Sequence, residues 1–232
     1  MKKYCSTDAC FDLYRGVEFV FPLMQGERIS TLVLSSNRDA LSESLKKFEN
    51  AIEESCKNFD VVYFGVNETM NLHSGTKSNF AQFNVEMAIR NLAEYSADCK
   101  KEVLKRNCHS LEEYNAKYKI KDSLKTIVII PSLENLLDSC SDAGQTKMNL
   151  MNILQMEEFS GVSVIACTTC SDVCCLDFRF INAFHNRMLF DVGSQELVPD
   201  ISNGMYKDTQ KLSSNEFYYF TFSNLNGRVL CV

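Results

Sequence analysis

The chain has 232 residues, of which 45% are hydrophobic and 23% charged, and its net charge is −6. This length fits one large domain or two small ones, and the balanced composition excludes a disordered tail, a collagen and a coiled coil. No apolar run approaches the ~18 residues that span a bilayer, and the first residues contain no apolar signal region. The negative net charge argues against electrostatic binding to the phosphate backbone of nucleic acids.

Strand-like and helical patterns alternate along the chain. In chain order, the predicted elements are strands at 17–21 and 29–34, a helix at 39–57, a strand at 60–66, helices at 82–105 and 111–118, a strand at 126–130, a helix at 133–156 interrupted at 140–144, strands at 162–167 and 187–192, and a hairpin of strands at 217–222 and 228–232. This alternation predicts an α/β domain with a mainly parallel central sheet, helices on both faces and a C-terminal hairpin.

Two of the helices carry more detailed signals. Ser110 with Glu113 three residues later has capping-box spacing, which predicts the start of the helix at 111–118. The helix at 82–105 is expected to bury an apolar stripe. The members of that stripe are Phe83, Met87, Leu92, Tyr95, Cys99 and Val103.

Basic residues gather in two runs near these helices. The runs are Lys100, Lys101, Lys105 and Arg106, then Lys117, Lys119, Lys121 and Lys125. On helices such runs are usually a solvated face, and we interpret them in this way.

The 11 cysteines do not indicate a disulfide framework. Their number is odd, the chain is larger than a stapled mini-domain, and no signal peptide precedes them. Cys56 ends a helical run and Cys167 lies in an apolar strand, where free cysteine acts as a small hydrophobe. We therefore expect free thiols in a reducing cytoplasm.

A cysteine cluster follows the strand at 162–167. Cys167, Cys170, Cys174 and Cys175 have the spacing C-x₂-C-x₃-C-C, which is dense enough to suggest zinc or an iron–sulfur cluster. However, no second C-x₂-C accompanies it, and the three histidines are each isolated in sequence. We favour no metal site here and keep a metal or redox protein as the weakest alternative.

Ligands of parallel α/β sheets bind beyond the carboxyl ends of the strands, so the residues there are the first candidates for chemistry. The stretch 35–42 follows a strand and enters a helix, which is the layout of the phosphate-binding loop G-x-x-x-x-G-K-[ST]. Ser35 and Ala40 replace its glycines, Leu41 replaces its lysine, and Ser42 alone is kept. The groups that wrap and neutralise phosphates are therefore missing. The vestigial nucleotide-binding positions are Ser35, Asn37, Arg38, Ala40, Leu41 and Ser42.

The strand at 126–130 shows a second loss. In nucleotide motors such a strand ends in Asp-Glu, which holds Mg²⁺ and orients the attacking water, but here it ends in Pro131 and Ser132. Glu134 lies two positions further on, at a helix start, where helix capping is the commoner role of a carboxylate. These three residues are the vestigial acidic position.

Several segments, taken in order, resemble FtsK/SpoIIIE-type ATPases. Residues 86–90 onward, closing with SLEEYN at 110–115, resemble the long helix and "EEYN" segment that precede the family's second motor strand. GVSVIACT at 161–168 resembles the "GIHLVLATQ" strand, with its glutamine replaced, and FINAFHNRMLF at 180–190 resembles "IKANIPTRIAF". The likeness covers residues 17–232 and leaves 1–16 as a lead segment before a single degenerate domain.

The resemblance implies a RecA-like P-loop NTPase fold. It also implies the degenerate last ATPase-like domain of the membrane ATPases of type VII secretion, the EssC/EccC family. Such a domain is catalytically inactive and serves substrate recognition, or regulation and assembly of the export ATPase, so we expect no enzyme and name no catalytic residue. The alternative is a nucleotide-binding FtsK/SpoIIIE-type motor unit that translocates DNA or protein.

The same resemblance implies the surroundings of the domain. No cofactor is expected, and at most weak ATP binding. The expected partners are neighbouring ATPase domains of the same polypeptide and a small helical secreted protein or its export-signal peptide, without nucleic acid and without direct membrane contact. The chain is expected to be a module of a longer polypeptide, cytoplasmic and tethered to the inner face of the cell membrane through its parent protein.

Overall fold

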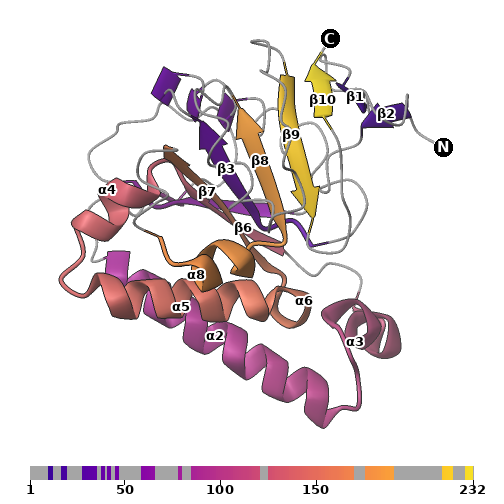
Figure 1. The fold of residues 1–232 in the computed structure, drawn as a ribbon. Helices are drawn as coiled ribbons and strands as arrows, with labels where there is room; N and C mark the ends of the chain where they lie inside the picture. Colours follow the sequence, from indigo (N-terminus) through magenta and orange to yellow (C-terminus); the bar gives the residue numbers. More distant parts are fainter. Residues whose placement is uncertain are drawn as a thin grey trace. The chain divides into compact units, whose positions relative to one another are not determined.

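The computed structural model describes part of the chain, in two compact units. The described residues are 10–12, 17–19, 28–35, 38–39, 41–42, 45–46, 59–65, 78–79, 85–120, 125–169, 176–190, 216–221 and 228–231. One unit comprises residues 1–56 and 167–232, and the other comprises residues 57–166. Figure 1 shows the elements of both units.

The unit of residues 57–166 contains a fully parallel sheet. Its strand order is β5-β4-β6-β7, and its strands are β4 (Phe59–Tyr63), β5 (Ser78–Asn79), β6 (Lys125–Ile130) and β7 (Val162–Thr169), the last of which runs on into the other unit. The register places Val62 opposite Val128, and Val128 opposite Val164. All eight residues of β7 are buried, as are the last four of β6, so these apolar runs are covered on both faces as the sequence predicts.

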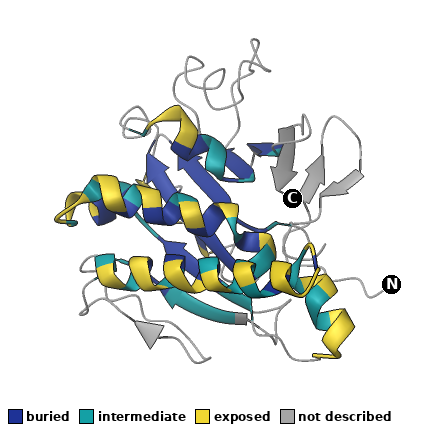
Figure 2. Cartoon of the chain, turned by 90° about the horizontal axis from the view of Figure 1, so that it is seen from below, coloured by how far each residue is buried: buried dark blue, intermediate teal, exposed yellow. Residues whose placement is uncertain are grey.

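The same unit also contains helices. They are α2 (Val85–Lys105), α3 (Leu111–Tyr118), α4 (Leu133–Asp138), α5 (Ala143–Gln155) and α6 (Glu157–Ser160). Helices α2 and α5 lie side by side, with buried residues toward the strands and exposed residues on the outer surface (Figure 2). The predicted interruption at 140–144 is confirmed, because α4 ends at Asp138 and Asp142 caps α5 by accepting a hydrogen bond from the N–H of Gln145.

The predicted start of α3 is confirmed at atomic detail. The Ser110 hydroxyl accepts a hydrogen bond from the N–H of Glu113 at 3.1 Å. The Glu113 carboxylate reaches back and accepts from the N–H of His109 at 2.7 Å, one residue before the cap. The first bond satisfies an N–H group that a helix start leaves without an intrahelical partner, and the second ties the residue before the cap to the first turn.

The predicted apolar stripe of α2 is wrong at Met87 and Tyr95 and confirmed at Val103. The buried residues of this helix are Ile89, Ala93, Ser96 and Val103, whereas Met87 and Tyr95 are about half exposed. The buried face thus includes the small side chains of Ala93 and Ser96 on the helix that packs against α5 and α6, and small residues let helix axes approach closely. Of the predicted stripe Val103 is buried, Leu92 and Cys99 are half-buried, and Phe83 lies outside the described residues.

The other unit holds a mostly antiparallel sheet. Its strands are β1 (Cys10–Asp12), β2 (Val17–Phe19), β3 (Thr31–Ser35), β8 (Asn186–Phe190), β9 (Glu216–Thr221) and β10 (Arg228–Cys231), in the order β2-β1-β10-β9-β8-β3. Among the strands described in this unit, β3 and β8 pair in parallel and the other pairs are antiparallel. The predicted hairpin is confirmed by the antiparallel pair β9 and β10, and the short helix α8 (Phe178–Ala183) precedes β8. The boundary predicted between residues 16 and 17 stays a prediction; it falls between β1 and β2, which pair with each other.

Among the described strands, β3 to β8 form parallel pairs, and the predicted α/β class with a mainly parallel sheet is confirmed. Within the part of the chain that the structure describes, no helix combines the length and apolar character needed to cross a membrane.

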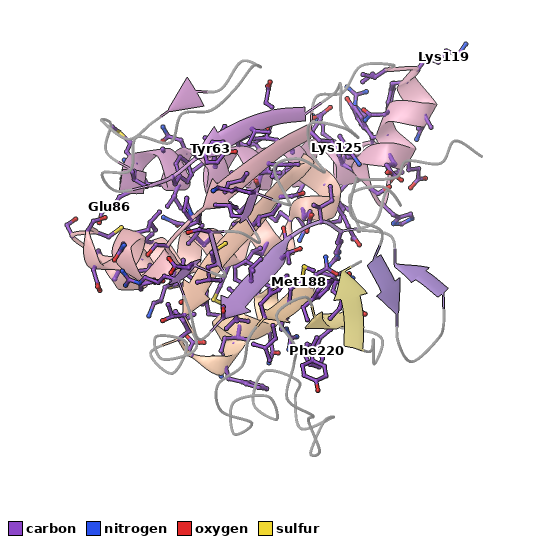
Figure 3. All side chains as sticks on the ribbon, turned by 90° about the horizontal axis from the view of Figure 1, so that it is seen from above. Tyr63, Glu86, Lys119, Lys125, Met188 and Phe220 are labelled. Carbon is purple, nitrogen blue, oxygen red and sulfur yellow. The ribbon has the colours of Figure 1, made fainter. Side chains whose placement is uncertain are left out.

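Glu86 joins the start of α2 to the connection between α4 and α5 (Figure 3). Its carboxylate accepts hydrogen bonds from the N–H of Asp142 at 2.9 Å and the hydroxyl of Ser141 at 2.7 Å, which hold the pKa of Glu86 below its usual value. A carboxyl group with a lowered pKa contributes stability above its unfolded pKa and loses it as the pH falls through the folded pKa.

We expect Glu86→Gln to lower the urea midpoint of unfolding at neutral pH and to leave it unchanged in acid below the folded pKa, because both proteins are then uncharged at this position. Glu94→Gln, on an exposed position of the same helix, is the matched control and should change neither midpoint. An equal loss from Glu86→Gln at both pH values would show that the charge is not what stabilises this junction.

Candidate functional site

The first candidate position follows β3. Ser35 is the last residue of that strand and is fully buried, and Arg38 is exposed on a helical turn. Leu41, which stands where a phosphate-binding loop has its lysine, is only 5% exposed, whereas Ser42 beside it is exposed. Asn37 and Ala40 lie outside the described residues. The side chain at the lysine position is thus part of the apolar core.

This arrangement limits what the loop can do chemically. A phosphate-binding lysine must place its ammonium group on the β- and γ-phosphates, in solvent or against the ligand. A leucine at this position supplies no charge, and its burial shows that the site favours an apolar side chain over a charged one. Ser42 alone keeps a residue type of the motif.

The second candidate position follows β6. Ile130 ends the strand fully buried, and Pro131 and Ser132 are half-buried. The Ser132 hydroxyl accepts a hydrogen bond from the N–H of Asn135 at 3.3 Å, so this residue is the N-cap of α4. Glu134 lies in the first turn of α4, where a carboxylate is favourable at the positive end of the helix dipole. The strand end therefore offers no carboxylate at the position where motors hold Mg²⁺.

The cysteine cluster is described only at its first member. Cys167 is fully buried in β7, as the sequence predicts for a small apolar side chain, while Cys170, Cys174 and Cys175 lie outside the described residues. Among the described residues, Cys99, Cys108, Cys140 and Cys167 are free thiols. No three His, Cys, Asp or Glu residues come together as metal ligands among the residues that the structure places.

Buried polar residues form two further features that the sequence patterns did not single out. Arg187 in β8 is 2% exposed, and its burial lowers the pKa of its guanidinium below the usual value. Glu157 at the start of α6 is 6% exposed and accepts a hydrogen bond from the Ser163 hydroxyl of β7 at 2.6 Å. In the sequence, the position of Arg187 before an apolar run could have indicated a buried charge. No local pattern could have indicated the contact of Glu157 with Ser163, because it joins a helix to a strand.

No protein-family model and no curated protein matches this sequence. Solved structures do match. The pCW3 conjugation coupling protein TcpA, in a monomer form with ATPgS, aligns with all of the chain and with 68% of its own length, at a TM-score of 0.72 and 10% identity. EssC (ATPases 2 and 3) from Geobacillus thermodenitrificans aligns with 97% of the chain and 43% of its own length, at a TM-score of 0.64 and 11% identity.

EccC (ATPases 2 and 3) from Thermomonospora curvata, in complex with a signal sequence peptide, aligns with 97% of the chain at a TM-score of 0.62 and 10% identity. The chain spans less than half of the EssC and EccC chains that it matches. These likenesses confirm, at the level of the fold, the resemblance that the sequence segments indicate. The chain therefore has the RecA-like P-loop NTPase fold that it shares with the ATPase domains of EssC and EccC and with TcpA.

Proposed function

We propose that this chain is a non-hydrolysing ATPase-like domain of a type VII secretion motor, acting in substrate recognition or in regulation and assembly of the export ATPase. The observation that carries the proposal is Leu41, which is buried at the position of the phosphate-binding lysine. The loss at the end of β6 supports it independently, because Ser132 caps α4 where a motor has its acidic pair.

The size of these losses supports the absence of ATP hydrolysis over weak ATP hydrolysis. Phosphoryl transfer depends almost wholly on positioned charge, and the removal of one stabilising electrostatic contact costs about 10²-fold or more in rate. Two such groups, the lysine and the acidic pair, are replaced here by uncharged residues. Their combined absence leaves no rate that a motor could use.

The proposed partners follow from the proteins of the same fold. EccC has been solved with a signal sequence peptide, and its chain and that of EssC hold more than one ATPase domain. By analogy, this chain would contact neighbouring ATPase domains and an export-signal peptide of a small helical substrate. An amphipathic helix in an apolar groove is the common mode of such recognition. The domain would act in the cytoplasm, tethered to the membrane through its parent protein.

A second candidate function is a nucleotide-binding motor unit that translocates DNA or protein. The observation in its favour is the match of the whole chain to TcpA, a conjugation coupling protein solved with ATPgS. This function requires a phosphate-binding loop with its lysine, and the buried Leu41 stands at that position instead.

Calorimetric titration with Mg²⁺-ATP, together with a phosphate-release assay, tests the two functions. We expect no phosphate release and no binding heat up to millimolar nucleotide, since the cation and the metal-binding carboxylates are missing. Binding without release would make the domain a nucleotide sensor built on the turn at 35–42. Release that stops on chelation of Mg²⁺ would overturn the proposal in favour of the motor.

A further inference from the structure

The end of α2 and the helix α3 bring the two basic runs of the sequence together. We use "the α2–α3 corner" for the exposed residues Lys105, Arg106, Lys117, Tyr118, Lys119 and Ile120. No residue of α3 is buried, so this helix is held by its caps and a few contacts rather than by a core-facing stripe. Its surface is therefore open over most of its circumference.

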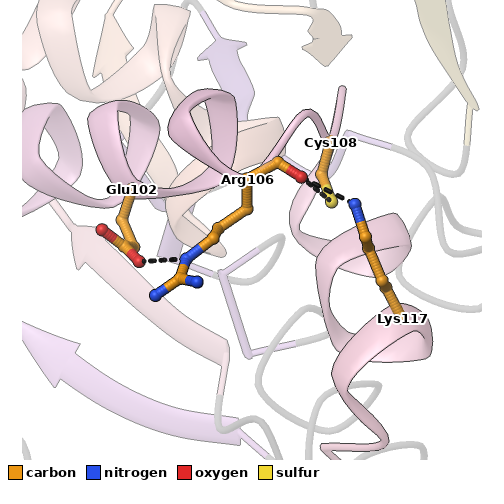
Figure 4. A network of polar contacts seen from close by, with 4 residues as sticks. All are labelled: Glu102, Arg106, Cys108 and Lys117. Carbon is orange, nitrogen blue, oxygen red and sulfur yellow. Dashed lines mark hydrogen bonds and ion pairs between the residues drawn. The ribbon is translucent and has the colours of Figure 1, made fainter.

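Specific contacts fix the corner (Figure 4). The ammonium group of Lys117 donates a hydrogen bond to the backbone carbonyl of Arg106 at 2.7 Å, and the thiol of Cys108 donates to the same oxygen at 3.6 Å. The guanidinium of Arg106 lies 5.7 Å from the centre of the Tyr118 ring, and the ammonium of Lys117 lies 6.0 Å from it. Two cations are thus held around one half-exposed aromatic ring.

Lys119 has a backbone conformation that favours glycine. It lies in the left-handed region with φ 57°, directly after the last residue of α3. Glycine is the usual residue at this position, because a side chain there costs energy. The chain nevertheless carries a lysine, which Figure 3 shows at the far end of α3, directed away from the helix. Ile120, the next residue, is 44% exposed.

The corner is positive on a chain that is negative as a whole. Three carboxylates lie nearby: Glu102 pairs with Arg106 at 3.0 Å, Glu112 pairs with Lys125 at 3.6 Å, and Glu113 accepts from the N–H of His109. Among the described residues, none forms an ion pair with Lys105, Lys117 or Lys119. Since the net charge is −6, an attraction to anions must come from such a local surface.

We propose that the α2–α3 corner binds an anionic lipid surface. Lysine and arginine side chains around an exposed tyrosine and an isoleucine are the pattern of a peripheral membrane contact, in which the rings and apolar tips enter the headgroup region and the cations pair with phosphates. This contact would differ from the sequence-based expectation that the domain has no direct membrane contact, which stays a prediction. It does not depend on the proposed function.

Lipid fits the corner better than single-stranded nucleic acid does. Bases bind such proteins by stacking on open aromatic faces. The Tyr118 ring, however, has the Tyr114 ring at 4.8 Å and two cations around it, so stacking would have to displace them. A lipid headgroup needs only the cations and the exposed part of the Tyr118 side chain, which is 42% exposed. It can bind while the contacts between the ring and the cations persist.

Sedimentation of the 232-residue chain with vesicles tests the proposal. We expect binding to vesicles of phosphatidylcholine mixed with phosphatidylserine, weakened by salt, and none to phosphatidylcholine alone. The double variant Lys105→Ala and Lys119→Gly should weaken binding about 25-fold, at about fivefold for each cation near the surface. The matched control Arg90→Ala with Arg179→Ala removes the same charge from exposed positions elsewhere and should change binding little. Ile120→Ser should weaken binding without changing the charge.

A second readout separates folding from binding. Because Lys119 is in the left-handed region, Lys119→Gly should leave the thermal midpoint unchanged or raise it while it weakens vesicle binding. The proposal is overturned if the mixed vesicles do not bind, or if the control pair weakens binding as much as the corner pair. It is also overturned if a single-stranded oligonucleotide binds through the same residues while vesicles do not.

Discussion

Replacing Leu41 by lysine is expected to lower the free energy of unfolding by about 3 kcal/mol and to restore no ATP hydrolysis. The side chain at this position is 5% exposed, so the substitution removes apolar contacts and brings an ammonium group to the edge of the core. Loss of a buried leucine alone costs about 2–5 kcal/mol, and a lysine escapes the rest of the penalty only by extending its charge to solvent. Urea unfolding and a phosphate-release assay measure the two effects.

The neighbouring residue supplies the control. Ser42 is exposed, so Ser42→Lys adds the same charge one position further along the chain and should change the stability by no more than about 0.5 kcal/mol. If Leu41→Lys were as stable as the parent and bound Mg²⁺-ATP, the lysine would be reaching the nucleotide. The turn at 35–42 would then be a phosphate-binding loop one substitution away from function, and the non-hydrolysing proposal would lose its main support.

The sequence predicted the features that local chemistry determines. The strands β6 and β7 followed from continuous apolar runs, and the start of α3 followed from Ser110 and Glu113, whose hydrogen bonds join residues only three or four positions apart. The interruption between α4 and α5 was visible in the same way. In each case the residues that decide the structure are neighbours in sequence.

The features that were missed depend on contacts between distant segments. The stripe of α2 was placed on its large apolar residues, but packing against α5 and α6 selected the face with Ala93 and Ser96. The spacing of apolar residues cannot show that a small residue lies where two helices pack closely. The α2–α3 corner also depends on a contact between separate segments. Each basic run alone is typical of a solvated face, and the hydrogen bond from Lys117 to Arg106 shows that the two runs lie together.

The candidate site was predicted from the motif residues that are missing from it. Comparison of 35–42 and 131–134 with the motor motifs identified the missing lysine and acidic pair, and the structure adds that Leu41 is buried and that Ser132 caps a helix. The sequence could not give these placements, because a leucine after a strand can equally well face solvent.

Asn186 is expected to be among the most sensitive polar positions of its unit, and Asn186→Ala should cost about 2–4 kcal/mol of stability. Its side chain is buried at the start of β8 and donates to the carbonyls of Arg28 at 2.8 Å and Ser30 at 3.4 Å. Its carbonyl oxygen accepts from the Tyr219 hydroxyl of β9 at 2.8 Å. Truncation removes these three side-chain bonds. The Ser30 carbonyl keeps the backbone N–H of Asn186 at 3.1 Å, and a buried group that loses its partner costs about 1–3 kcal/mol.

A double-mutant cycle tests whether the bond between Asn186 and Tyr219 contributes to that cost. Tyr219→Phe removes only the hydroxyl and should lose about 1–2 kcal/mol, because the Asn186 oxygen is then buried without this donor. With Asn186→Ala already present, the same substitution should cost much less, so the two losses should fall short of additive by about 1 kcal/mol or more. Strict additivity in denaturant unfolding would mean that the two residues stabilise the unit separately. The loss at Asn186 would then come from its bonds to the segment before β3, where Arg28 lies 158 positions earlier in the chain.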